Sequence, residues 1–277
     1  MHKPRGMKKV FLIIAAYLLA TILLFPYLIM LITSLKGEKE VYSLPPTLFP
    51  QEWTFQNFID IWNKIPLLDY LLNSFYISLG TMLVTLVCAI PAAYVLARLN
   101  FVGKKYYLYL VIVTQMFAPI VLLVGLFREI QFLGLMDSIW GLILVNAAFN
   151  QAFAVWILNG YFTSIPYDLE EAAWLDGCTK WQALRKIILP IAVPGIITTV
   201  IFVFIMAWNE FVVALTLIST ETNKPLTVGI YAFFGKFDVK WQYLFATSLV
   251  TTIPAIVLFL MIEKYLISGL TSGSVKH

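Results

Sequence analysis

Six polar or aromatic residues stand inside long apolar stretches of the sequence, where their side chains could bind a solute. They are Asn146, Asn150, Gln151, Trp208, Asn209 and Glu210. Asn146 and Asn150 are four positions apart, so on a helix they share one face. Amides and a carboxylate can hydrogen-bond a solute, and the indole of Trp208 can stack on it. The alternative is that these groups bond neighbouring helices together, at about 0.6 kcal/mol each.

Histidine and cysteine form no catalytic or metal-binding cluster in the sequence. His2 and His277 lie near the ends, and Cys88 and Cys178 stand far apart. Neither a histidine-based acid–base pair, nor a disulfide framework, nor a metal site is indicated. The nucleotide-binding pattern G-x-x-x-x-G-K-[ST] is also absent from the sequence. We therefore expect no enzyme and no cofactor bound by this chain.

A loop between two apolar stretches, residues 163–190, has the pattern of a short surface helix. Ser164 can cap its N-terminus, and Pro166 suits its first turn. Acidic side chains favour the positive end of a helix dipole, and three follow directly: Asp168, Glu170 and Glu171. Gly177 can end the helix in a left-handed conformation.

The same loop could present a docking surface. Ala172 and Ala173 give the short helix a small-residue face on which another protein can pack closely. A second helical stretch continues to Leu189, and Pro190 and Pro194 break it before the next apolar stretch. The alternative is an amphipathic helix that lies on a membrane without a partner.

These residues need a scaffold within a membrane, because the composition does not suit a soluble one. Of the 277 residues, 61% are apolar and 12% charged, and the mean hydropathy is +0.86. Soluble domains have about 45–50% apolar and about 25% charged residues. The net charge of +4 is spread in small groups rather than along a basic groove, which excludes a nucleic-acid binder. We predict an all-α integral membrane protein.

Six apolar stretches approach or exceed the roughly 20 residues that a helix needs to cross a bilayer. They are residues 10–35, 70–97, 106–127, 138–162, 191–218 and 243–266, and the third contains the isolated Gln115. With the N-terminus inside, 12 of the 19 Lys and Arg residues fall on the inner side. We predict that both termini are cytoplasmic. Residues 1–9 would form a cytoplasmic segment and residues 10–277 a single transmembrane domain.

The loop of residues 163–190 resembles the EAA signature of ABC-importer permeases. Its anchor positions are Glu171-Ala172-Ala173, then Gly177, then Ile187-x-Leu189-Pro190 after nine further residues. Four other segments resemble the MalG-like carbohydrate branch of that family: Asn73-Ser74, Trp208-Asn209-Glu210-Phe211, Lys224–Gly229 and the tail Gly269–Lys276. The resemblance covers the chain from about residue 8.

This resemblance implies one of two related permease subunits of an importer in a prokaryotic cell membrane. An extracytoplasmic binding protein would deliver a sugar, a di- or oligosaccharide. An ATPase dimer, which holds the ATP and Mg²⁺, would drive its import. Residues 163–190, here called the coupling loop, would hold the coupling helix that docks on an ATPase. Its docking residues would be Glu170, Glu171, Ala172, Ala173, Asp176, Gly177, Leu189 and Pro190. The six residues inside the spans would line or gate the solute path.

Three alternatives stay open at this point. The first is a permease of the same type for a polyol, a glycerol phosphate or a polyamine, although the spans offer no basic residue that would face a cavity and attract an anion, since Lys264 stands at the end of the sixth span beside Glu263. The second is a secondary transporter, in which inverted repeats are expected and are not evident here. The third, an integral membrane enzyme, lacks a catalytic cluster at either membrane face.

Overall fold

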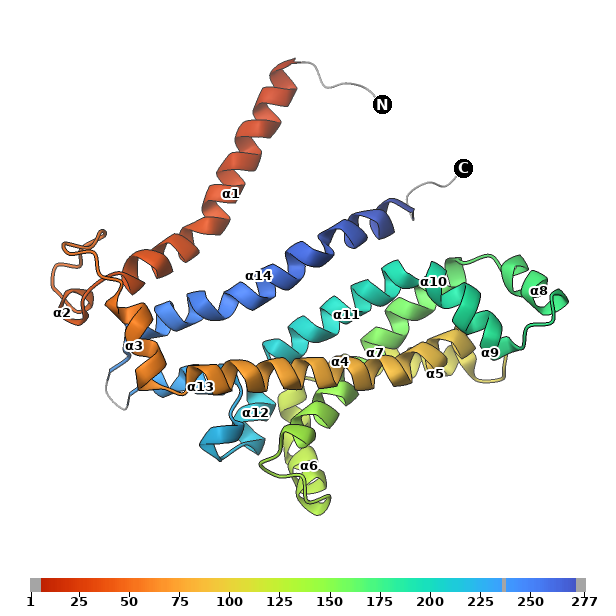
Figure 1. Cartoon of the computed structure of the whole chain (residues 1–277). Helices are drawn as coiled ribbons and strands as arrows, with labels where there is room; N and C mark the ends of the chain where they lie inside the picture. The colour runs from red at the N-terminus through yellow and green to blue at the C-terminus, as the bar shows by residue number, and fades with distance from the viewer. Residues whose placement is uncertain (1–5, 236–237, 273–277) are drawn as a thin grey trace. The chain divides into compact units, whose positions relative to one another are not determined.

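The computed structural model describes residues 6–235 and 238–272, and in these ranges the chain is helical (Figure 1). Within the described ranges, the β pairing consists of one isolated antiparallel bridge between Phe234 and Val239. The predicted all-α class is therefore confirmed. The end of the tail that resembles the carbohydrate branch, residues 273–277, lies outside the described residues.

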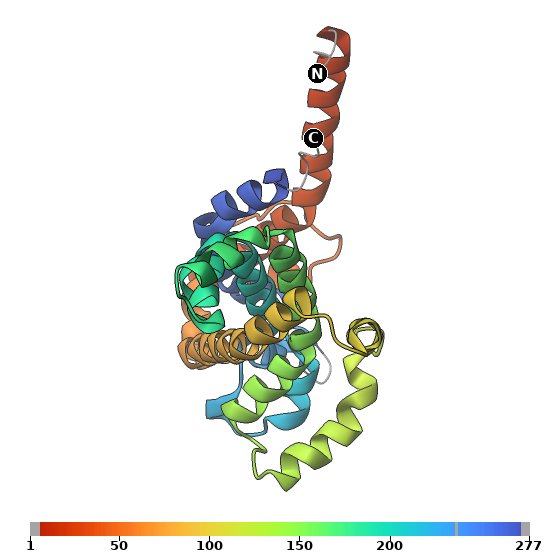
Figure 2. The same cartoon turned by 90° about the vertical axis from the view of Figure 1, so that its right-hand side faces the viewer.

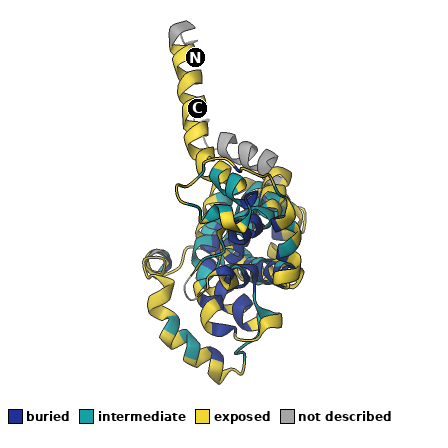
Figure 3. Ribbon diagram, turned by 90° about the vertical axis from the view of Figure 1, so that its left-hand side faces the viewer, coloured by how far each residue is buried: buried dark blue, intermediate teal, exposed yellow. Residues whose placement is uncertain are grey.

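In the part of the chain that the structure describes, four helices are long and apolar enough to cross a bilayer. They are α1 (Gly6–Ser34), α4 (Leu67–Arg98), α7 (Ile139–Ser164) and α14 (Trp241–Ser272). These helices match the first, second, fourth and sixth predicted spans. Helix α1 exposes its side chains from Lys8 to Leu28, and its apolar surface suits a lipid environment (Figure 3).

The third predicted span, residues 106–127, is not one helix. It consists of α5 (Lys104–Thr114) and α6 (Pro119–Phe132), with residues 115–118 between them. Pro119 has no backbone N–H and disfavours helical geometry at the preceding residue, so Ala118 is extended at φ −65° and ψ 131°. The expectation of a continuous helix here is wrong, and the proline explains why.

The fifth predicted span is also interrupted. Helix α11 (Val193–Trp208) ends at Asn209, and the short α12 (Val212–Leu217) follows. Before α11, the helical stretch Lys180–Ile191 meets it at a bend of 76°, as the prolines of this region predict. If that bent pair is one span, the described residues contain five candidate spans. The count of six spans therefore stays a prediction.

The chain divides into two compact units. The first combines the N-terminal part up to Leu67 with Ile230–Ile253. Its further elements are α2 (Glu38–Val41), α3 (Gln56–Lys64), a 3₁₀ turn at Tyr231–Phe233 (η3) and the start of α14. Within this unit Lys240 forms ion pairs with Glu38 at 2.6 Å and with Asp238 at 3.0 Å. These pairs connect the loop after α1 to the segment before α14.

The second unit, Leu68–Gly229 with the rest of α14, contains the packed helices of interest. One buried cluster joins α4, α7, the coupling loop and α11, and includes Ala93, Leu158 and Ile188. Helix α11 lies very close to α7, because a Cβ added at Gly195 would come within 2.3 Å of the Tyr161 ring. A second buried cluster joins α4, α6, α7, α12 and α13 (Leu226–Ile230). Figure 2 shows α6 extending away from the α4–α7–α11 bundle.

Candidate functional site

The coupling loop contains the short helix that its sequence predicts. Helix α8 (Asp168–Leu175) has three acidic residues in its first turn: Asp168, Glu170 and Glu171. The expected cap at Ser164 is wrong, because α7 continues through this residue and its hydroxyl donates to Tyr161 O at 2.8 Å. Pro166 likewise lies before the helix rather than in its first turn.

The chain reverses after α8 at a glycine and returns through an irregular helix. Gly177 has φ +84°, the left-handed conformation that was predicted. Thr179 and Gln182 then form a reciprocal capping box that starts α9 (Lys180–Ala183). The helix widens into a π turn over Leu184–Ile188 (η1) and continues as α10 (Leu189–Ile191) to the bend. Turns of this π type are frequent at functional sites.

A desolvated ion pair fixes the coupling loop to the C-terminal end of α4. Glu170 is fully buried, and its carboxylate accepts hydrogen bonds from Arg98 Nε and, at 2.7 Å, from the Tyr94 hydroxyl. Arg98 also donates to Ile165 O at 3.1 Å, at the start of the loop. The charge of Arg98, the last residue of α4, is favourable at a helix C-terminus. Neither Arg98 nor Tyr94 was singled out from the sequence, because their role depends on a contact 72 or more positions away.

The remaining predicted docking residues divide between the interior and the surface. Ala173 is buried, as Glu170 is, so these two face the chain's own interior. The exposed residues of α8 and its C-cap are Asp168, Leu169, Glu171, Ala172, Leu175 and Asp176, and of these Leu175 is 90% exposed. Leu189 is half-buried and Pro190 exposed.

The predicted polar cavity in the spans is closed in this conformation. Asn146 and Asn150 are buried on α7, and Asn150 Nδ2 donates to Asn146 O at 2.8 Å. Trp208 is buried and stacks on Phe204 with ring centroids 5.7 Å apart. The space among Ser74, Asn146 and Glu210 does not admit a water molecule. Gln151, also on α7, is half-buried. Asn146, Asn150 and Trp208 therefore pack against their neighbours here, and the place of the six residues on a solute path stays a prediction.

Glu210 and Asn209 form the interruption between α11 and α12. The Glu210 carboxylate accepts hydrogen bonds from the backbone N–H groups of Val213 at 2.7 Å and Ala214 at 2.9 Å. It thereby satisfies donors at the start of α12 that have no partner within that helix. Asn209 is exposed, and its Nδ2 donates to Ile205 O at 2.9 Å, at the end of α11. This pair therefore ends one helix and starts the next.

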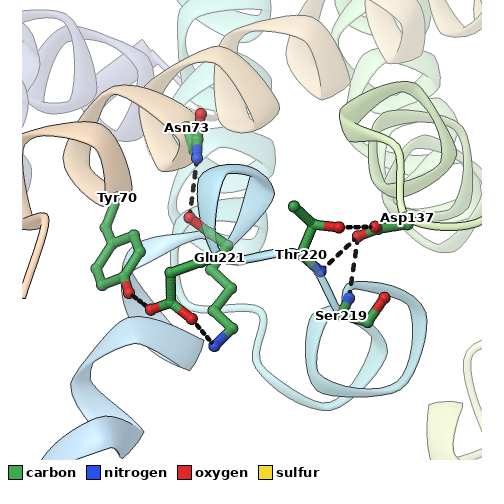
Figure 4. Close-up of polar contacts among 7 residues, drawn as sticks. Tyr70, Asn73, Asp137, Ser219, Thr220 and Glu221 are labelled. Atoms are coloured by element: carbon green, nitrogen blue, oxygen red, sulfur yellow. Dashed lines mark hydrogen bonds and ion pairs between the residues drawn. The ribbon is translucent and has the colours of Figure 1, made fainter.

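Residues 217–229, here called the return segment, are held by side chains of Tyr70, Asn73 and Ser74, and the sequence singled out only the last two of these, without a structural role (Figure 4). Asn73 Nδ2 donates to Thr222 O at 2.7 Å and Lys224 O at 3.0 Å, and the Ser74 hydroxyl accepts from Leu226 N at 2.8 Å. Tyr70 donates its hydroxyl proton to the carboxylate of Glu221. The Asn73-Ser74 element at the start of α4 thus positions this segment.

Asp137 fixes the other side of the return segment. Its carboxylate accepts hydrogen bonds from the backbone N–H groups of Ser219 and Thr220, both at 3.0 Å, and from the Thr220 hydroxyl. The Thr220 hydroxyl and N–H hold the pKa of the Asp137 carboxyl below its ordinary value. Asp137 has φ 56°, a conformation that Asp and Asn tolerate better than most residues. The unusual φ is a local feature of the backbone. The hydrogen-bond partners of the Asp137 carboxylate lie 82 and 83 positions away, and the sequence does not make them evident.

Residues 89–272 match the family of binding-protein-dependent transport system inner membrane components. This is more than half of the chain, and the chain therefore belongs to this family of ABC-importer permeases. A solved structure of a bacterial ABC transporter for the acidic polysaccharide alginate contains a chain of the same fold. The TM-score is 0.80 at 22% identity, over 96% of this chain and 99% of that one.

Several curated relatives are similar over almost their whole length. The inner membrane ABC transporter permease protein YcjP of Escherichia coli K12 is 38% identical, over 95% of this chain and 94% of that protein. The trehalose/maltose transport system permease protein MalG of Thermococcus litoralis is 34% identical, over 98% of each. The trehalose transport system permease protein SugB of Mycobacterium tuberculosis is 39% identical, over 84% and 89%. The chain is a carbohydrate-type ABC permease and a multi-pass protein of the cell membrane.

Proposed function

We propose that this chain is one of two related, non-identical permease subunits of an ATP-driven importer for a di- or oligosaccharide. An extracytoplasmic binding protein delivers the sugar, and an ATPase dimer, which binds ATP and Mg²⁺, drives transport. This chain contributes no nucleotide site of its own. The names of the relatives support a sugar, since they include trehalose and maltose transport systems.

The observation that carries this proposal is the geometry of the coupling loop. The buried pair of Glu170 and Arg98 connects α8 to α4, while Leu175 and its exposed neighbours face away from the chain. Movement of α8 is therefore transmitted to α4 through this pair and to α11 through the bend at residue 192. Such a connection suits an element that docks on an ATPase and moves the spans.

Substitutions on the exposed face of the coupling loop test this role. Ala172→Asp adds a charge to the docking surface, and Gly177→Asp adds strain at a left-handed turn, of order 1 kcal/mol. Both variants are expected to reach the membrane but to lose ATPase co-purification or to uncouple ATP hydrolysis from uptake. Ala172→Ser, which keeps the small volume, is the matched control. If both Asp variants retain the ATPase and wild-type uptake, the loop is not the coupling element.

The membrane topology is tested by chemical labelling. Six spans with both termini cytoplasmic, residues 1–9 as a cytoplasmic segment and residues 10–277 as one domain, place the coupling loop and the tail on the same side. Cysteines at Thr179 and Ser274, in a variant without Cys88 and Cys178, should react with an impermeant maleimide only from the cytoplasmic side. Reaction of either cysteine from outside contradicts this topology.

The helix interruption at Asn209 and Glu210 is proposed to gate the solute path. A helix that stops and restarts can bend there without loss of the hydrogen bonds along its length. Glu210→Ala removes the acceptor for two N–H groups of α12, and Asn209→Ala removes a bond at the end of α11. Both variants should assemble with the partners and show reduced uptake. Normal uptake in both excludes the gate.

The sugar itself is identified with the assembled importer. The chain is purified with its co-expressed partners and reconstituted with its binding protein in proteoliposomes. Four sugars after which relatives are named are then tested for stimulated ATP hydrolysis and for uptake: trehalose, maltose, diacetylchitobiose and sulfoquinovosyl glycerol. Uptake that needs ATP and is inhibited by vanadate supports an importer, whereas uptake driven by an ion gradient alone contradicts it.

A further inference from the structure

A hollow of about 360 Å³ lies between the interrupted third span and α7. Six of the residues that line it are Gln115, Leu122, Gly125, Leu126, Glu129 and Phe149. They come from residues 115–118, from one face of α6 and from α7. The volume lies within the range of about 300–1,000 Å³ that is usual for small-molecule sites. The break in the helix therefore creates space that a continuous span would fill.

Two polar side chains face this hollow with hydrogen-bonding capacity to spare. Gln115 Nε2 donates to Phe149 O at 3.2 Å, which fixes the amide at the edge of the hollow. Among the described residues, Gln115 Oε1 has no hydrogen-bond partner, and the Glu129 carboxylate has neither a hydrogen bond nor an ion pair. Both groups are acceptors, so they suit a ligand that brings hydroxyl donors.

The rest of the lining is apolar and includes an aromatic ring. Phe149 is half-buried, and Leu122 and Leu126 lie on the facing side of α6. A few convergent polar groups on a mostly apolar wall are the usual composition of a ligand pocket. A sugar ring matches this wall, since it has hydroxyl groups at its edge and C–H groups on its face. An acyl chain does not match it, because a carboxylate and a free amide oxygen against hydrocarbon are unfavourable.

The hollow also lies on a different face of α7 from the residues that the sequence singled out. Helix α7 places Asn146 and Asn150 in the packed interior, and it places Ala148 and Phe149 at the hollow. The polar residues of the interior leave no room for a solute, whereas the hollow does.

We propose that this hollow is the subsite at which this chain binds one ring of the transported sugar. The inference rests on the proposed import function and assigns its solute contacts to Gln115, Glu129 and Phe149. Hydroxyl groups of the sugar donate to Gln115 Oε1 and to the Glu129 carboxylate, while the C–H face of the ring packs on Phe149. The negative charge of Glu129 favours a neutral sugar over an acidic one.

Cysteine accessibility tests whether the hollow is part of a water-filled path. A Cβ added at Gly125 meets nothing within 4 Å, so Gly125→Cys places a thiol in the open hollow. Val124, the adjacent residue of α6, is 73% exposed, is not part of the lining, and provides the matched control Val124→Cys. In the complete importer without Cys88 and Cys178, the cationic thiol reagent MTSET should modify Gly125→Cys but not Val124→Cys. If MTSET modifies neither cysteine, lipid or a protein helix fills the hollow, and the proposal is overturned.

Transport measurements test whether a sugar occupies it. The probe is ¹⁴C-trehalose or ¹⁴C-maltose, whichever the wild-type importer takes up. Gly125→Leu places an apolar side chain in the hollow, starting from a Cβ that meets nothing within 4 Å, and should lower uptake by about tenfold or more. Val124→Leu should retain wild-type uptake. The transported sugar should also protect Gly125→Cys from MTSET. Glu129→Gln should increase uptake of sulfoquinovosyl glycerol relative to the neutral sugar.

The two hypotheses fail in different ways. If the wild-type importer takes up no sugar, the proposed function fails, whatever the labelling shows. If the wild type transports and Gly125→Leu transports equally well, the subsite is wrong while the importer stands. If Gly125→Leu does not assemble, MTSET modification of Gly125→Cys is compared with and without the transported sugar. Equal modification in the two conditions overturns the subsite.

Discussion

Two connections of the chain return to opposite ends of α4, and they are fixed there by different kinds of contact. The coupling loop meets the C-terminal end mainly at one buried carboxylate, that of Glu170, which pairs with Arg98 and accepts a hydrogen bond from Tyr94. The return segment meets the N-terminal end through hydrogen bonds of Tyr70, Asn73 and Ser74. A single desolvated pair concentrates the stability of a connection at one point, whereas several hydrogen bonds distribute it. The coupling loop should therefore be sensitive to one substitution, and the return segment should weaken in steps.

The largest effect is expected from Arg98→Ala. This substitution leaves the fully buried Glu170 carboxylate without its cation, a loss of about 3–5 kcal/mol for a broken buried pair. The coupling loop should separate from α4, with a lower Tm of the purified complex and loss of the bound ATPase. The double variant Arg98→Met with Glu170→Leu removes both charges and should recover much of the Tm. A Tm of Arg98→Ala equal to that of the wild type contradicts a structural role for the pair.

A smaller effect is expected from Gly229→Ala at the end of the return segment. The added Cβ would lie 2.1 Å from Cδ2 of the buried Tyr70 ring, so the segment or the ring must shift, at about 1–3 kcal/mol. Thermal unfolding of the complex measures this loss. Gly160→Ala is the matched control, because a Cβ there meets nothing within 4 Å. Equal Tm values for the two variants mean that the close approach at Tyr70 is not retained in the membrane.

Asn73→Ala should weaken the return segment by a similar or smaller amount. It removes the donor to two backbone carbonyls, a loss of about 1–3 kcal/mol if these stay unsatisfied. Limited proteolysis should cleave the variant faster within residues 217–229. Asn73→Asp should be cleaved faster still, because its carboxylate faces the same two carbonyl oxygens. Asn63→Ala, at an exposed position of α3, is the control and should be cleaved like the wild type.

The smallest effect is a dependence on pH at Asp137. Its pKa lies below the ordinary 3.8 in the folded chain, so its contribution to stability is present above that value. That contribution is lost as the pH falls through the lower folded pKa. Proteolytic cleavage of the return segment should therefore accelerate in acid. Asn tolerates the same φ as Asp, so the Asp137→Asn variant should fold but should lack the part of this acceleration that comes from Asp137. If the cleavage rates of the variant and the wild type depend on pH in the same way, Asp137 is not the group responsible.

The sequence predicts the features that depend on local pattern. The lengths of the apolar stretches predict the four long helices α1, α4, α7 and α14. The left-handed turn at Gly177 is predicted from the residue type, because glycine adopts a positive φ readily. The break before Pro119 is not predicted although its signal is local, since the apolar composition of residues 106–127 continues through the proline. For Glu210 the sequence leaves a structural or gating role and a solute contact open, and the cap that it forms on α12 is a structural role.

Contacts between distant segments could not be predicted in this way. The partners of Glu170 and Asp137 lie 72 to 83 positions away, so no periodicity or spacing in one sequence connects them. The hollow beside Phe149 has the same origin, since it exists only where the broken third span meets α7. Single side chains could be singled out from the sequence, but their environments could not.

The π turn in the coupling loop has a consequence for chain length. A π turn accommodates one more residue per hydrogen-bonded ring than an α-helix, because its bonds join residues five apart rather than four. Deleting one residue from Leu184–Ile188 would convert it to ordinary α-helix and leave the orientation of everything before it relative to α11 nearly unchanged. The same deletion in α9 would instead rotate those residues by about 100°, and Leu175 and the rest of the exposed face would then point elsewhere. A one-residue deletion inside the π turn should therefore be tolerated better than one in α9.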